Sequence, residues 1–299
     1  MNKKILLILV SLVISLMLTS CTGNNNQSAD GAFIGGTQGI TAEFQPLGVE
    51  EEGKFTIYDT ESFSLEVTLH NKGEYQIQSN DVTVKLLGPS PEEFTGIPSF
   101  ELKNKDIIDK ISDLVPLGGE ETVSFSDDAK YKQTVTGFVD REWFGNIEYK
   151  YKTYAIIPEV CLKEDVTDER VCKVTEAKTY FVSGAPITIT AVEESTAGKG
   201  IMALKIKVKN VGSGKVSTQT GEFGVRDELA YSLDDPSWEC KSGGRLNEAR
   251  LVNGEAEIVC KLKTALPENT ISTKQVLLTL DYKYRDLIQE TLRIKESVE

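Results

Sequence analysis

The sequence predicts an all-β chain that forms two successive β-sandwiches. Three observations predict it: short runs in which apolar and polar residues alternate, turn residues between these runs, and a pattern that occurs twice. In Phe63–Leu69 and Met202–Val208, every second residue is apolar. A period of two places neighbouring side chains on opposite faces, so each run predicts a strand with one buried face. Helical periodicity is scarce, and its best example is Lys105–Leu114, where four aliphatic residues share one helical face.

The N-terminus has the features of an export signal. Two lysines lie within Met1–Lys4, and the fourteen residues of Ile5–Leu18 are apolar except for two serines. A helix of that length spans only about 21 Å, which is less than the roughly 30 Å hydrocarbon core of a bilayer. A basic start followed by a short apolar core is typical of a secretory signal peptide. A permanent N-terminal anchor helix is the alternative.

The end of this segment resembles the lipobox of prokaryotic lipoproteins. In Leu18-Thr-Ser-Cys21, a branched apolar residue and two small residues precede a cysteine. The resemblance implies that residues 1–20 are removed and that Cys21 carries diacylglycerol. Two acyl chains would anchor the protein to the outer face of the cytoplasmic membrane or at the cell surface, because each buried methylene contributes about 0.8 kcal/mol. Residues 21–38 begin with small polar residues and predict a flexible tether.

The rest of the chain contains one sequence pattern twice. Leu65–Gly73 and Leu204–Gly212 each combine an alternating run with Asn-x-Gly, which favours a tight turn. Further along, Tyr149–Lys152 matches Tyr282–Arg285, and a Leu-Val pair followed by glycine precedes a strand in both copies. Matches that keep the same order along the chain indicate a duplicated module.

A glycine and a proline mark the boundary between the two copies. Gly184-Ala-Pro186 separates them, so we expect one sandwich over residues 39–183 and a second over residues 184–299, each able to fold alone. Strands that end in Asn-x-Gly, with the turn Leu114–Gly119 before a later strand, resemble the CARDB-type Ig-like modules of prokaryotic surface proteins. Together with the lipobox, the chain resembles uncharacterised surface lipoproteins of archaea. This resemblance implies tandem Ig-like domains, similar to fibronectin type III, and brings no known activity with it.

Five cysteines divide into the lipobox residue and two pairs. Cys161 and Cys172 flank a polar loop, while Cys240 and Cys260 both lie in the second copy. In an exported protein, one pair in each copy predicts structural disulfides. A metal site made from these four cysteines is the alternative, but it needs short paired spacings such as C-x2-C, which the sequence lacks. We therefore expect no metal and no cofactor.

The composition argues against several classes of function. Lys and Arg number 33 against 46 Asp and Glu, and the net charge of −13 makes nucleic acid an unexpected partner. His70 is the single histidine, which leaves no pair for zinc and no spare base for a catalytic triad. Adjacent acidic residues on a strand point to opposite faces, so they do not form an acid–base couple. We expect no catalytic residues and no enzyme, with weak calcium binding by acidic loops as the alternative to a solvated surface.

Two neighbouring aromatic residues are the candidate ligand contacts. Trp143 and Phe144 cannot both face inward from one strand, so we expect one of them to be exposed. An exposed aromatic ring can stack on a sugar or anchor a protein interface, whereas a buried Trp143 would belong to the core. We expect Trp238 to pack in the core.

The functional prediction combines these observations. We expect an exported, lipid-anchored envelope protein with non-enzymatic modules for surface adhesion, scaffolding or protein–protein interaction. Its expected partners are the membrane, other envelope proteins and glycans. The alternative is a glycan- or ligand-binding accessory subunit of an envelope transport or secretion complex.

Overall fold

The structure, a computed structural model, describes residues 32–168, 170–174 and 177–297, whose regular secondary structure is almost entirely β-strand. The predicted signal peptide and Cys21 lie outside these residues. Within them the only helical turn is the 3-10 turn η1 (Pro91–Glu93), so the all-β prediction is confirmed. The segment Lys105–Leu114, the best candidate for a helix in the sequence, is not helical. Ile108 in this segment instead forms a β-bridge with Ile77, and both side chains are fully buried.

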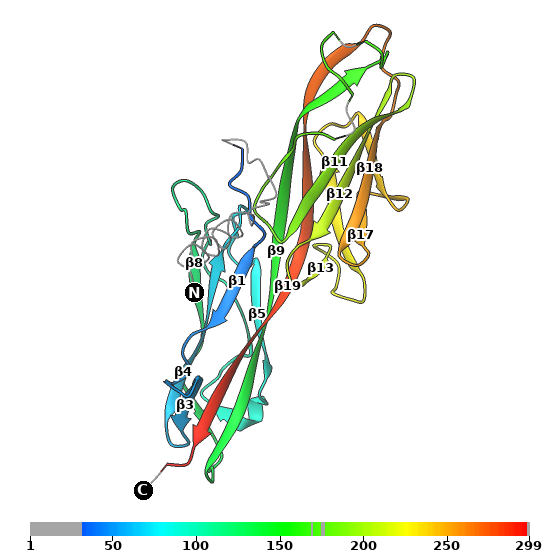
Figure 1. Cartoon of the computed structure of the whole chain (residues 1–299). Coiled ribbons are helices and arrows are strands. Elements are labelled where there is room, and N and C mark those ends of the chain that lie inside the picture. The colour runs from blue at the N-terminus through cyan, green and yellow to red at the C-terminus, as the bar shows by residue number, and fades with distance from the viewer. Residues whose placement is uncertain (1–31, 169, 175–176, 298–299) are drawn as a thin grey trace, which may run out of the picture.

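Two smaller antiparallel sheets lie at opposite ends of an elongated molecule (Figure 1). The sheet of the first half has the strand order β1 (Ile40–Phe44), β4 (Ser62–Asn71), β8 (Glu120–Tyr131), β6 (Phe94–Thr95). The sheet of the second half has the order β11 (Ile187–Gly198), β12 (Ile201–Asn210), β18 (Glu255–Leu262), β15 (Trp238–Ser242), β16 (Arg245–Leu246).

A third sheet runs the whole length of the molecule and packs against both smaller sheets. Its main order is β17 (Glu248–Leu251), β14 (Asp227–Leu233), β19 (Ile271–Lys295), β9 (Phe138–Lys163), β5 (Val82–Gly88), β7 (Glu101–Lys103). Four short strands join its sides: β2 (Val49–Glu51), β3 (Lys54–Tyr58), β10 (Phe181–Val182), β13 (Lys215–Ser217). Each smaller sheet and the part of the long sheet that faces it enclose an apolar core, as expected for a β-sandwich.

β9 and β19 pair antiparallel along nearly their full lengths, from Phe138 opposite Lys295 to Lys163 opposite Ile271. The long sheet therefore joins strands from both sides of the predicted boundary at residue 184, because β9 precedes that residue and β19 follows it. The C-terminal end of β9 pairs with the start of β19 in the second half. The C-terminal end of β19 pairs with β3 in the first half. Figure 1 shows the two long strands running through both halves.

The duplicated pattern has the same local geometry in both copies. The side-chain oxygen of Asn71 accepts hydrogen bonds from the Tyr151 hydroxyl (3.1 Å) and from the N–H of the glycine two residues later (3.3 Å). Asn210 repeats this with Tyr284 (3.2 Å) and its own following glycine (3.1 Å). Two segments that matched separately in the sequence are thus bonded to each other in each copy.

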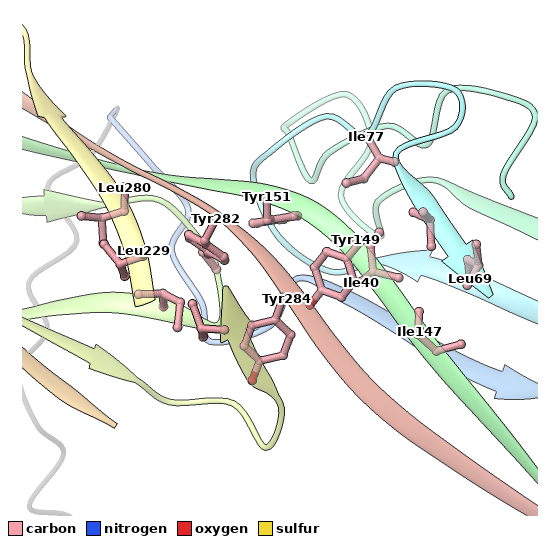
Figure 2. Close-up of a cluster of buried hydrophobic side chains, with 14 of the residues drawn as sticks. Ile40, Leu69, Ile77, Ile147, Tyr149, Tyr151, Leu229, Leu280, Tyr282 and Tyr284 are labelled. Atoms are coloured by element: carbon pink, nitrogen blue, oxygen red, sulfur yellow. The ribbon is translucent and has the colours of Figure 1, made fainter. Parts of the chain in front are cut away.

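Four tyrosines lie where the two halves meet. Tyr149 and Tyr151 of β9 face Tyr284 and Tyr282 of β19, with ring centroids 5.6 and 6.3 Å apart (Figure 2). The Tyr282 hydroxyl also bonds the hydroxyl of Thr153 at 2.9 Å. Burial raises the pKa of all four phenols, so they stay neutral at physiological pH.

One carboxylate ties three chain segments together beside these tyrosines. Glu74 accepts hydrogen bonds from the N–H groups of Ile34 (2.9 Å), Gly35 (2.8 Å) and Gly184 (2.6 Å). We call this meeting point of residues 34–36, 72–75 and 183–186 the joint. Because the joint is bonded internally and the long sheet crosses it, we expect the two halves to move as one body.

A charged cluster near the end of β19 predicts acid sensitivity. Asp140 of β9 accepts hydrogen bonds from Arg293 (2.8 Å) and Lys54 (2.5 Å), and the bond from Arg293 is the main reason that its pKa falls to about 2. Because this pKa lies below the unfolded value near 3.9, the carboxylate stabilises the fold above about pH 4 and loses that effect as the pH falls toward 2. We expect Asp140→Asn to be less stable than wild type at pH 7 and to approach wild type near pH 2, as measured by urea unfolding.

The control is Glu257→Gln, which removes an exposed carboxylate paired with Lys205 at 3.4 Å. We expect its stability difference from wild type to be small at both pH values, because exposed ion pairs contribute little. An Asp140→Asn difference that stays constant from pH 7 to pH 2 would contradict this assignment.

Candidate functional site

Trp143 lies in the core and is not available to a ligand. Its side chain is 0% exposed and packs against Phe94 and Phe63, with ring centroids 5.1 and 6.3 Å away. The expectation that Trp143 contacts a ligand is therefore wrong. Phe144 is half-buried, because strand alternation places it on the face of β9 opposite to Trp143. Trp238 is buried as expected.

The four cysteines other than Cys21 form two disulfides. Cys161 bonds Cys172, and Cys240 bonds Cys260, which are direct register partners on neighbouring strands. Each closed loop contributes about 3 kcal/mol in the chain-entropy model. Disulfides are typical of proteins in an oxidising, extracellular environment. Cys21 lies outside the described residues, so its lipidation stays a prediction.

Buried charges beside the first disulfide hold its loop in place. Glu194 accepts the N–H of Cys161 at 2.8 Å and pairs with Lys178 at 2.8 Å. Burial raises the pKa of Glu194, and the ammonium of Lys178 opposes that shift. Lys163 is fully buried and donates to two backbone carbonyls of the loop, one of them that of Cys172. Glu194, Lys178 and Lys163 thus position the loop through their hydrogen bonds and ion pair, a role that the sequence did not reveal.

A groove opens on the first half, between β1 and β19. The groove is open to solvent and has a volume of about 500 Å³. Phe44, Phe55 and Ile288 provide apolar walls, and Glu43 and Glu290 add carboxylates. These residues come from β1, β3 and β19, so only the folded chain brings them together.

One backbone edge of β19 is open beside this groove. β19 pairs with β13 up to Arg285 and with β3 from Leu292 onward. Between these two points, β9 is the only strand of the described chain that pairs with it, which leaves the opposite edge unpaired. The N–H groups of Leu287 and Thr291 bond the carboxylates of the residues just before them, at 2.9 and 2.8 Å. These two amides therefore point toward the open edge.

A second cavity, of about 440 Å³, lies beside the loop that the first disulfide closes. Its charged residues include Glu164 and Lys199, which pair with each other at 2.9 Å. Because this ion pair already satisfies the carboxylate of Glu164 and the ammonium of Lys199, the groove beside β19 is the better candidate for a binding site.

The residues define a class but no family. The chain is an all-β sandwich protein with two disulfides and a groove beside an open strand edge. Comparison with protein-family models and with curated proteins found no match. Among the described residues, no helix has the length and apolar character needed to span a bilayer.

Proposed function

We propose that this chain is a non-enzymatic cell-envelope lipoprotein that binds an extended segment of another envelope protein. The observation that carries the proposal is the open edge of β19 beside an apolar groove. An unpaired edge offers N–H and C=O groups, which an incoming strand can use to extend the sheet. At this edge the N–H groups of Leu287 and Thr291 bond the carboxylates of Asp286 and Glu290, which an incoming strand would replace. The groove supplies apolar contacts for every second side chain of that strand.

The charges beside the groove indicate the chemistry of the partner. Glu43, Asp286 and Glu290 lie on or next to it, and the whole chain has a net charge of −13. Complementary charge speeds encounter and excludes acidic competitors. The expected partner segment therefore alternates aliphatic residues with lysine or arginine.

The proposed location follows from the N-terminus and the disulfides. The signal-like residues 1–20 and the lipobox cysteine support export and anchoring at the outer face of the membrane, and the disulfides fit that environment. The alternative role in glycan binding was based on Trp143, Phe144 and the neighbouring tyrosines. Trp143 and the four tyrosines are buried, and Phe144 alone of this set is partly exposed, so strand addition has the stronger support.

The test is a proline placed on the open edge. Gln289 lies between Leu287 and Thr291, at a position where the N–H points away from β9. Gln289→Pro removes that donor, while the bonds to β9 are expected to persist, since proline is tolerated on strand edges. Gln289→Ala keeps the N–H and is the matched control. Cross-linking mass spectrometry on intact cells would compare both variants with wild type.

We expect Gln289→Ala to keep the cross-links that wild type forms around the groove and Gln289→Pro to lose most of them. Equal cross-linking of both variants would contradict strand addition. The same data report the N-terminal peptide. A terminus at lipidated Cys21 is expected, and an unprocessed Met1 would overturn the lipoprotein assignment.

A further inference from the structure

A loop of the first half exposes two leucines to solvent. Leu114 is 93% exposed and Leu117 is 77% exposed, with the exposed Pro116 between them. The loop leads into β8 and projects from the end of the first half nearest the joint (Figure 1). Exposed apolar residues that cluster, in contrast to those that lie singly, mark surfaces that contact a membrane or a partner.

Backbone hydrogen bonds hold this loop in a defined shape. Near its start, the N–H of Ile111 donates to Gly73 at 2.9 Å, and the N–H of Gly119 closes the loop on Asp109 at 2.8 Å. At the tip, Ser112 and Val115 exchange backbone bonds of 3.1 Å. The leucines are therefore presented outward on an ordered support and do not fold back onto the core.

The loop lies close to the point from which the chain leads back to the predicted anchor. Gly73, which holds the loop, precedes Glu74, and the Glu74 carboxylate binds the N–H of Ile34. Ile34 is thirteen residues after Cys21. A fully extended chain of that length spans at most about 45 Å. A lipid on Cys21 would thus keep this part of the molecule near the bilayer.

We propose that this loop inserts Leu114 and Leu117 into the bilayer to which the acyl chains of Cys21 attach the protein. This inference rests on the proposed function, because it requires the lipid anchor. It adds a second, apolar contact that fixes which side of the elongated molecule faces the membrane. The loop carries Lys105 and Lys110 against three aspartates, so its charges nearly balance and anionic lipid is not needed.

Tryptophan fluorescence in the full-length, lipidated protein tests the inference. Both native tryptophans are buried, with Trp143 0% and Trp238 4% exposed, so an introduced surface tryptophan is distinguishable. Leu117→Trp places the probe in the loop. Val225→Trp is the matched control, because Val225 is 100% exposed and lies in the second half. Each variant would be reconstituted into phosphatidylcholine vesicles with and without brominated acyl chains.

We expect brominated chains to quench Leu117→Trp several times more strongly than Val225→Trp, and to do so equally at low and high salt. Equal quenching of the two variants would overturn the inference. If high salt abolishes the quenching of Leu117→Trp, the inference is also overturned, because apolar insertion does not depend on ionic attraction. A double variant, Leu114→Asp with Leu117→Asp, should remain folded. On vesicles, protease should cleave its tether faster than that of wild type, because the loop no longer holds the protein against the bilayer.

The same preparation separates this inference from the proposed function. If mass analysis shows no lipid on Cys21 and the protein leaves the vesicles, the lipoprotein assignment fails. If the protein is lipidated and stays bound while Leu117→Trp is not quenched, only the inserted loop is wrong.

Discussion

Replacing Trp143 with alanine is expected to lower the free energy of unfolding by about 3–5 kcal/mol. The side chain is fully buried between Phe63 and Phe94, so truncation removes a large apolar surface and leaves a cavity that the rigid strands cannot close. A loss of this size is a large part of the total stability of an ordinary domain, which is about 5–15 kcal/mol. Urea unfolding followed by circular dichroism would measure it.

The matched control for this prediction is the neighbouring Phe144→Ala. Phe144 lies on the opposite face of β9 and is only half-buried, so we expect a clearly smaller loss of stability. If both variants lose the same amount, or if Trp143→Ala leaves the protein as stable as wild type, the core position of the indole is wrong.

Replacing Glu74 with alanine is expected to loosen the joint and to cost about 3 kcal/mol or more, since hydrogen bonds to charged groups contribute about 1.5–3 kcal/mol each. Its carboxylate satisfies the backbone N–H groups of Ile34, Gly35 and Gly184 at once, and all three would lose their acceptor. Hydrogen exchange should become faster at these three amides before it changes in the core of either half.

Glu61→Ala is the control for the joint. Glu61 is exposed, and its carboxylate accepts a single backbone hydrogen bond, from Tyr58 at 2.8 Å. We expect this variant to change stability little and to leave exchange at the joint unaltered. Unchanged exchange at Ile34, Gly35 and Gly184 in Glu74→Ala would show that the carboxylate does not hold the three segments.

Local signals in the sequence predicted the strands and the disulfides. Alternation located strands such as Met202–Val208, because burial of one sheet face imposes a period of two on the residues. The candidate helix over Lys105–Leu114 does not form, and the reason is physical. A single short run gives little helical stability in isolation, and burying Ile108 in a bridge with Ile77 competes with it successfully.

The candidate site was less accessible to sequence reasoning, because it depends on contacts between distant segments. Alternation showed that Trp143 and Phe144 face opposite sides but not which side is the core. The groove combines Phe44, Phe55 and Ile288, which are far apart in the chain. Its open edge exists only because the strands beside β19 stop at Arg285 and resume at Leu292, and no local pattern encodes that gap.

The pairing of β9 with β19 also sets the order in which the chain can fold. β19 comprises residues 271–295, so it is synthesised after β1 to β18, yet the first half needs its end as a partner for β3 and β9. Contacts across such long sequence separations form slowly, because loop closure must precede any gain from pairing. We therefore expect both halves to complete their folding only after β19 becomes available. A fragment that ends before Ile271 would lack a central strand of both halves.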